Sequence, residues 1–179
     1  MKKFISVLKN VAKSDNVYWI KQDGAHYVGC RYFAARFQHV DDNKRQGLAS
    51  FGIFAPNTAR TKGQESTAPT SGVVSIFKSL EAGECDALDI VDTGLNCPPG
   101  YKDSLRVLAA AESGDKCLVN AEYLEALACL YPTFPALRWQ YGSIYVGNHN
   151  AILMPIQYPN VKDHQLDTWM KGGWLPVKR

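Results

Sequence analysis

The stretch that decides the fold runs from Val119 to Gln157 and reads VNAEYLEALACLYPTFPALRWQYGSIYVGNHNAILMPIQ. Asn120 can cap a helix, and Glu122 places a carboxylate in its first turn, at the positive end of the helix dipole. Apolar residues then recur at helical spacing until Pro132 ends the pattern. Three strand-like runs follow: Leu137–Tyr141, Ser143–Val146 and Ala151–Gln157. The stretch therefore predicts a helix followed by a three-stranded meander.

The N-terminal part of the chain predicts a second unit of the same kind. Phe4–Ala12 has one apolar face and predicts a helix. Val17–Gln22 predicts a strand, and Asp23-Gly24 is a strong hairpin signal. We expect the remaining elements in this order: a long return strand over Ala25–Phe37 that bends near Gly29, a charged turn over Asp41–Gln46, and a third strand over Leu48–Phe54.

A short internal echo links the two units. HYVG at His26–Gly29 matches IYVG at Ile144–Gly147, and YWI at Tyr18–Ile20 lies at nearly the same offset from LRWQ at Leu137–Gln140. The echo is compatible with a repeated helix-plus-meander unit. It is equally compatible with an ordinary α+β domain that contains two similar sheets.

The segment between the units is less regular. Residues 55–72 are rich in Thr, Ser, Pro and Gly and predict a mobile surface loop. After it we expect a helix over Val73–Leu80, a strand over Ala87–Val91, a turn-rich connection over Leu95–Lys102, a short helix over Asp103–Ala111 and a strand over Lys116–Val119. The whole predicts an α+β fold, with one domain over residues 1–157 and a C-terminal extension over 158–179.

Composition narrows the class of protein. A chain of 179 residues, 46% of them hydrophobic, suffices for one domain with a sizeable core. No apolar run approaches the roughly 18 residues that a membrane span needs, and Phe4–Leu8 is too short for a signal-peptide core. The five cysteines include no C-x-x-C pair, and no histidine has metal-ligand spacing. We therefore expect a cytoplasmic protein without a disulfide framework, a metal or another cofactor.

Two short motifs in the deciding stretch resemble the last half-domain of the bacterial DNA sliding clamp, the polymerase III beta-type processivity factor. The helix pattern is carried by Asn120, Ala121, Tyr123, Leu124, Ala126 and Leu127, and the end of the last strand by Leu153, Met154, Pro155 and Ile156. The resemblance implies two helix-plus-three-strand halves related by a pseudo-two-fold axis. It also implies a non-enzymatic role in DNA replication, with replication proteins or a clamp as partners and an oligomer if DNA is encircled. The chain departs from the family by continuing for 22 residues beyond Gln157.

The resemblance also implies two kinds of contact surface. An apolar cleft beside the last strand would bind a partner's peptide through Leu153, Met154, Pro155 and Ile156. Basic side chains on the helices would contact duplex DNA without reading its sequence, here Lys2, Lys3, Lys9 and Lys13. The alternatives are that Leu153 and Ile156 fill the core and that the lysines form a solvated helix face. Glu122 and Glu125 on the second helix would repel phosphate.

The C-terminal extension supports a different hypothesis. Gln165, Leu166 and Trp169 resemble the short peptide with which partners bind the clamp, although Thr168 departs from that pattern. The chain could then be an inhibitor or adaptor that binds a clamp through this tail. The tail's tryptophans could instead pack back on the domain. A rival from another class is a small cysteine-dependent hydrolase, since a Cys–His pair need only meet in space.

Overall fold

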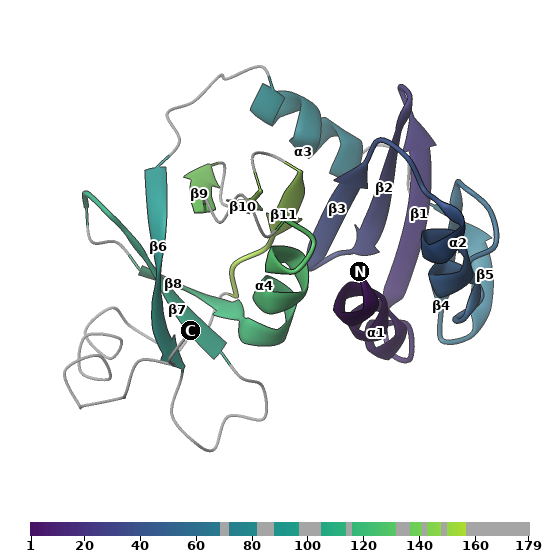
Figure 1. Cartoon of the computed structure of the whole chain (residues 1–179), viewed down its shortest axis with the longest axis horizontal. Helices are drawn as coiled ribbons and strands as arrows, with labels where there is room; N and C mark the ends of the chain where they lie inside the picture. The colour runs from purple at the N-terminus through teal and green to yellow at the C-terminus, as the bar shows by residue number, and fades with distance from the viewer. Residues whose placement is uncertain are drawn as a thin grey trace.

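The structure is a computed structural model in which residues 1–68, 72–81, 88–96, 105–113, 116–131, 137–140, 143–147 and 150–156 are described. The described residues form four helices and an eleven-stranded antiparallel sheet (Figure 1). The helices are α1 (Lys2–Val11), α2 (Asp42–Ala49), α3 (Gly72–Glu81) and α4 (Ala121–Ala128). The strands are β1 (Asn16–Gln22), β2 (Ala25–Cys30), β3 (Phe33–Phe37), β4 (Thr58–Thr61), β5 (Gln64–Thr67), β6 (Leu88–Asn96), β7 (Leu105–Ala110), β8 (Lys116–Asn120), β9 (Leu137–Gln140), β10 (Ser143–Val146) and β11 (Ala151–Leu153). The predicted α+β class is confirmed.

The centre of the sheet is two meanders joined back to back. The strand order is β5-β4-β1-β2-β3-β11-β10-β9-β6-β7-β8, so β1-β2-β3 and β9-β10-β11 meet at the β3·β11 pair. Ala35 lies opposite Ala151 in that pair, and both side chains are fully buried. Each alanine also pairs with the valine of its own YVG motif, Val28 or Val146. The two meanders are thus related by a pseudo-two-fold axis near Ala35 and Ala151.

The sequence echo falls on equivalent strands of the two meanders. Residues 22–29 (QDGAHYVG) and 140–147 (QYGSIYVG) are identical at five of eight positions. In the first hairpin Gln22 pairs with Ala25, and in the second Gln140 pairs with Ser143. The same two-residue connection therefore sets the same register in both hairpins, because register follows from loop length.

Each face of the sheet has its own apolar cluster. On one face α1 and α4 lie side by side, and Leu8, Leu124 and Leu127 share one core with Val28 and Val146 (Figure 1). On the other face α3 covers the sheet, where the Phe77 ring lies 5.2 Å from that of Tyr27. The helix that the apolar spacing predicts over Val73–Leu80 is confirmed as α3. The strands expected over Ala87–Val91 and Lys116–Val119 are confirmed as β6 and β8.

The predicted long strand over Ala25–Phe37 is wrong, because the chain turns back at Arg31 and Tyr32 to form β2 and β3. Gly29 permits this turn. A Cβ on Gly29 would lie 2.3 Å from the Phe33 carbonyl oxygen and 2.6 Å from Ala34 Cα, closer than real atoms approach. The glycine that suggests a bend is therefore a point of close approach between two strands.

The charged turn predicted over Asp41–Gln46 and the strand over Leu48–Phe54 are also wrong. Asp41 is the N-cap of α2, and its Oδ1 accepts a hydrogen bond from the Lys44 backbone N–H at 2.9 Å. Leu48 ends up on the buried side of this helix, and Ile53 packs in the same core after a turn. A side-chain cap stabilises a helix start by about 1 kcal/mol, which suffices to redirect a short ambiguous segment.

Two further expectations fail for topological reasons. The predicted loop over 55–72 contains the β4–β5 hairpin, whose tip residues Lys62 and Gly63 have φ values of 49° and 84°. β4 pairs with the edge of β1, and Asn57 Oδ1 accepts from the Lys21 N–H at 2.9 Å. The helix predicted over Asp103–Ala111 is β7, which pairs with β6 and β8 on its two sides. Sheet pairing thus orders part of the predicted loop, and it overrides helix propensity in β7.

Among the helices of the described part of the chain, none has the length and apolar character that crossing a membrane would require.

Candidate functional site: a cleft between the two symmetry-related helices

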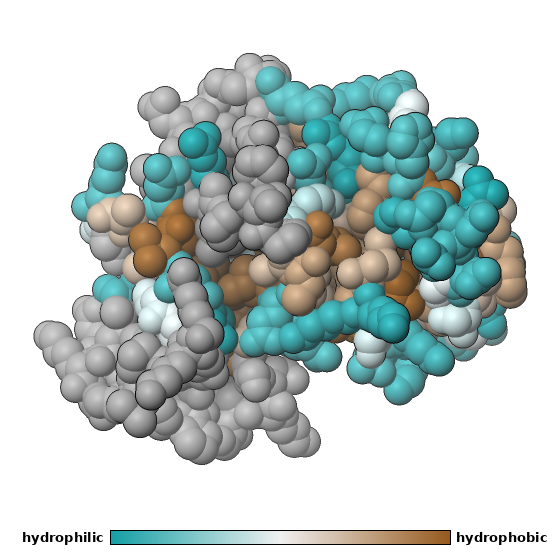
Figure 2. Space-filling view, in the orientation of Figure 1, coloured by the Kyte–Doolittle hydropathy of each residue, from teal (hydrophilic) through white to brown (hydrophobic). Residues whose placement is uncertain are grey.

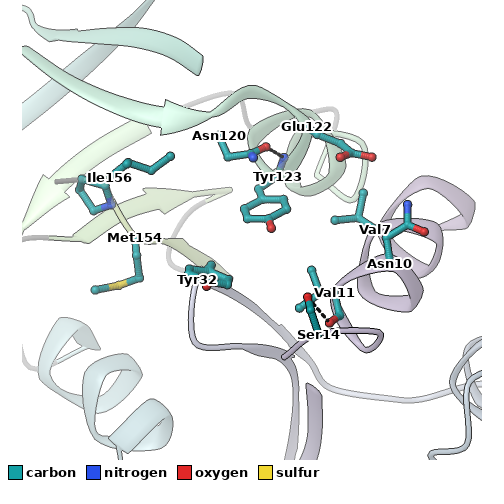
Figure 3. A pocket seen from close by; sticks show the side chains of 11 residues that line it. Val7, Asn10, Val11, Ser14, Tyr32, Asn120, Glu122, Tyr123, Met154 and Ile156 are labelled. Carbon is teal, nitrogen blue, oxygen red and sulfur yellow. Dashed lines mark hydrogen bonds between the residues drawn. The ribbon is translucent and has the colours of Figure 1, made fainter. Parts of the chain in front are cut away.

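A cleft of about 510 Å³ opens where the C-terminal end of α1 meets the start of α4 (Figure 3). Four parts of the chain supply its walls: α1, the turn between β2 and β3, the first turn of α4, and the segment after β11. The described lining residues are Val7, Asn10, Val11, Ser14, Tyr32, Asn120, Glu122, Tyr123, Met154, Pro155 and Ile156. The cleft therefore draws on both halves of the pseudo-symmetric domain.

The first turn of α4 supplies one wall. Asn120 is the N-cap, and its Oδ1 accepts from the Tyr123 N–H at 3.1 Å, which confirms the predicted cap. The Tyr123 ring points into the cleft, stacked on Tyr32 with the ring centroids 6.0 Å apart, and it lies 4.7 Å from the Phe33 ring (Figure 3). Such aromatic pairs contribute about 0.5–1.5 kcal/mol beyond burial, so this side of the cleft is preformed.

The segment after β11 supplies the opposite wall. The Met154 N–H donates to the Tyr32 carbonyl at 2.8 Å, and the Ile156 N–H donates to the Leu118 carbonyl of β8 at 2.7 Å. Pro155 lies between them and has no N–H to satisfy. The segment is thus fixed at both ends, while the Met154 side chain points away from Tyr123 (Figure 3), and its Sδ accepts a hydrogen bond from Ser143 Oγ at 3.4 Å.

The predicted partner-binding residues are divided by this geometry. Met154, Pro155 and Ile156 line the cleft, whereas Leu153 is fully buried in the core, opposite Phe33 and Ile144. Gln165, Leu166 and Trp169 lie outside the described residues. The sequence indicates nothing of the α1 wall or of Tyr32, because these residues reach the cleft only through the pairing of the two halves.

Polar groups lie along the edge of the cleft. Asn10, Ser14, Asn120 and Glu122 are the polar lining residues besides the two tyrosines, and Glu122 alone among the described lining residues carries a charge. Glu122 extends from the first turn of α4 toward α1 (Figure 3). The Asn10 Oδ1 accepts from Lys13 Nζ at 3.1 Å, so one of the predicted DNA-contacting lysines is held at this edge.

The four lysines predicted to contact DNA have different surroundings. Lys2 and Lys9 are exposed on α1, while Lys3 forms an ion pair with Glu125 of α4. That hydrogen bond to Glu125 is the main reason why the pKa of Lys3 is raised. Arg106, only 7% exposed, lies 3.7 Å from Glu125 and 2.9 Å from Asp92. The helical face therefore carries charges of both signs.

The described cysteines differ in exposure. Burial raises the pKa of the Cys30 thiol to about 11 and that of Cys117 to about 12, whereas Cys129 is exposed. A thiol with so high a pKa remains protonated at neutral pH, the opposite of what a nucleophile needs. Within the described ranges no group of three or more His, Cys, Asp or Glu residues could hold a metal ion. Cys85 and Cys97 lie outside those ranges.

No protein-family model, no curated protein and no solved structure matches this chain.

Proposed function

We propose that this chain is a non-enzymatic binding protein of DNA replication that holds a short peptide segment of a partner protein in the α1–α4 cleft. One observation carries the proposal. Three residues that the sliding-clamp resemblance assigns to a peptide-binding cleft, Met154, Pro155 and Ile156, form one wall of a cleft of about 510 Å³. A cleft of this volume is within the range that accommodates a small ligand or one or two large side chains.

The lining suits a protein ligand. Tyr123, Pro155 and Ile156 are partly exposed in the cleft and offer apolar surface to a ligand. Asn10 and Asn120 lie at the edge, where side-chain amides can hydrogen-bond to the backbone of an extended segment. The pseudo-two-fold arrangement of two helices over two meanders is the plan that the clamp resemblance implies, and it supports the assignment to replication.

Contact with duplex DNA is the second candidate. Lys2 and Lys9 are exposed on the same helical face, and phosphate contacts need positive charge only. Glu122 and Glu125 on the neighbouring helix counter that charge, and Lys3 is already paired. For this reason peptide binding is the first candidate function and contact with duplex DNA is the second.

Selection of random twelve-residue peptides displayed on phage tests the peptide hypothesis without a guess about the partner. Clones selected on the wild-type protein are then tested on two tryptophan variants of α1. Asn10→Trp fills the cleft from an exposed position, and Lys2→Trp is the matched control at an exposed position of the same helix that does not line the cleft. We expect recurring clones that lose binding to Asn10→Trp at least tenfold and keep binding to Lys2→Trp.

Recurring clones that bind both variants equally, or a failure to obtain any, would refute the cleft as a peptide site. Light scattering with and without circular and linear duplex DNA tests the second candidate. A larger species that forms only with DNA, and that stays on circular but leaves linear DNA, would support a ring. A particle mass that DNA does not change would leave peptide binding alone.

A further inference from the structure

Most of the charged side chains around the cleft form ion pairs or hydrogen bonds within the protein. Glu125, one turn after Glu122 on α4, contacts both Lys3 and Arg106. On the opposite side, Arg31 Nε lies 2.7 Å from Asp15 Oδ2, and its guanidinium carbon lies 4.7 Å from the centroid of the Tyr32 ring. Lys13 donates to Asn10. The charged groups that flank the cleft are therefore mostly satisfied within the chain.

Glu122 is the exception. It lines the cleft, it is exposed, and no ion pair among the described residues involves it. Lys3 interacts with Glu122 only weakly, since Glu125 dominates the charge environment of that lysine. The position in the first turn of α4 favours a carboxylate through the helix dipole, and this carboxylate lies at the edge where a ligand would enter.

We propose that the segment bound in the cleft carries a lysine or arginine beside its apolar anchor, and that Glu122 receives this positive charge. The inference rests on the proposed peptide-binding function and names the chemistry of the partner. The anchor, a large aliphatic or aromatic side chain, enters the cleft beside Tyr123, and the basic residue lies across the edge toward α1. An acidic segment would meet the unpaired carboxylate and be disfavoured, so Glu122 selects partners by charge.

The expected loss of peptide affinity in Glu122 variants follows from the solvent exposure of Glu122. An exposed ion pair is worth about 0.2–1 kcal/mol, and a partly desolvated pair at an interface is worth more. We therefore expect Glu122→Gln to weaken a basic peptide about threefold and Glu122→Lys to weaken it about tenfold. The loss should shrink as salt is raised, because salt screens exposed charges.

The selected phage peptides test this inference directly. The expected result is that clones that compete for the cleft contain a basic residue within two or three positions of a large apolar one. For the tightest clone, fluorescence anisotropy gives the affinity of three synthetic versions, with the basic residue kept, replaced by glutamine, or replaced by glutamate. Wild type should bind them in that order of decreasing affinity, and Glu122→Lys should reverse it. Glu65→Lys on β5 is the matched control, since it makes the same charge change at an exposed position away from the cleft.

The outcomes separate the two proposals. Peptides that occupy the cleft but bind wild type and Glu122→Lys equally would overturn the charge inference and leave peptide binding intact. The absence of any clone sensitive to Asn10→Trp would overturn the proposed function itself. Thermal unfolding of wild type, Glu122→Gln and Glu122→Lys, followed by circular dichroism, should show all three folded at the temperature of the binding measurement, so that a loss of binding is not a loss of folding.

Discussion

The two halves of this domain share a backbone plan but use it differently. In the N-terminal half, the chain after β3 folds into α2, and Leu48 and Ile53 close the core beside α1. In the C-terminal half, the chain after β11 crosses to β8 in three residues, Met154–Ile156, and these described residues border the cleft beside α4 without filling it. The pseudo-symmetric helices and strands therefore form the framework, whereas the segments that follow β3 and β11 determine where a ligand can enter.

The same asymmetry holds for charge. α1 carries Lys2, Lys3 and Lys9, whereas α4 carries Glu122 and Glu125, so the two helices attract each other across the pseudo-axis. Only one such pair, Lys3 with Glu125, is formed directly between them. If the halves have diverged from one repeat, the divergence has produced one basic and one acidic helix.

The largest expected effect tests whether the halves form one cooperative unit. Leu8 and Leu127 are both fully buried in the core that α1 and α4 share. We expect Leu8→Ala and Leu127→Ala each to lower the free energy of unfolding by about 2–5 kcal/mol, because each leaves a cavity in the same core. Urea denaturation should give one transition for each variant. A two-step transition in either would show that the halves unfold separately.

The next effect concerns the glycine that ends each YVG motif. A Cβ at Gly29 would meet backbone atoms of β3, whereas a Cβ at Gly147 would lie 2.6 Å from Tyr131 Cβ, and Gly147 has a φ of 67°. We expect Gly29→Ala to cost about 3 kcal/mol and Gly147→Ala about 2 kcal/mol in chemical denaturation.

Gly24→Ala supplies the control for backbone conformation alone. Gly24 has a φ of 78° and open space around it, so its substitution should cost about 1 kcal/mol. If Gly147→Ala costs no more than Gly24→Ala, the contact with Tyr131 is unimportant. If Gly29→Ala is tolerated, the close approach of β2 and β3 described above is incorrect.

A smaller effect is a pH dependence of stability that arises from His26, in the N-terminal half only. His26 lies where the second meander has Ile144, and Trp19 Nε1 donates to His26 Nδ1 at 3.0 Å. Desolvation, together with the charges of Lys21, Arg45 and His39, lowers the pKa of His26 below its usual 6.5. The unfolded chain therefore binds a proton more readily than the folded one. Stability should be full above about pH 6.5 and should fall as the pH drops toward the lowered folded-state pKa.

Urea midpoints between pH 5 and 7.5 check this expectation for wild type and His26→Gln. The difference between the two curves isolates His26 from the other titrating groups. We expect that difference to vary with pH in the stated direction. The control His39→Gln should keep most of the wild-type slope, and parallel curves for wild type and His26→Gln would contradict the assignment.

Sequence reasoning succeeds where a local signal and the tertiary structure agree. α1, α4, the Asp23-Gly24 hairpin and the strands of the second meander all follow from periodicity, capping and turn chemistry within a few residues. It fails at α2, β4, β5 and β7, whose structure depends on a cap or a pairing partner that the local pattern does not reveal. The strand β7 is the clearest case, because its run LRVLAA is compatible with a helix until β6 and β8 flank it.

The same reasoning explains how much of the cleft the sequence predicts. Met154, Pro155 and Ile156 are adjacent in the chain and share one motif, so a resemblance can identify them. Val11, Tyr32 and Tyr123 are brought to the same cleft from three different elements, and no pattern along the chain connects them. Glu122 is visible as a helix-start residue, but its place at the edge of a cleft follows only from the packing of α1 on α4.

The smallest expected effect tests the contact that joins the two helices. Lys3 and Glu125 are about half exposed, with side-chain exposures of 43% and 49%, so their ion pair should contribute about 0.2–1 kcal/mol. A double-mutant cycle with Lys3→Ala and Glu125→Ala isolates that coupling from the contact of Glu125 with Arg106. The coupling energy from urea denaturation should fall when salt is raised from 0.05 to 0.5 M, because the Debye length then falls well below 10 Å.

A coupling that exceeds about 1 kcal/mol and resists salt would show instead that the pair is shielded from water, so that Lys3 would be withdrawn from any contact with DNA. A coupling near zero would leave Lys3 as available to phosphate as Lys2 and Lys9, and would strengthen the second candidate function at the expense of the first.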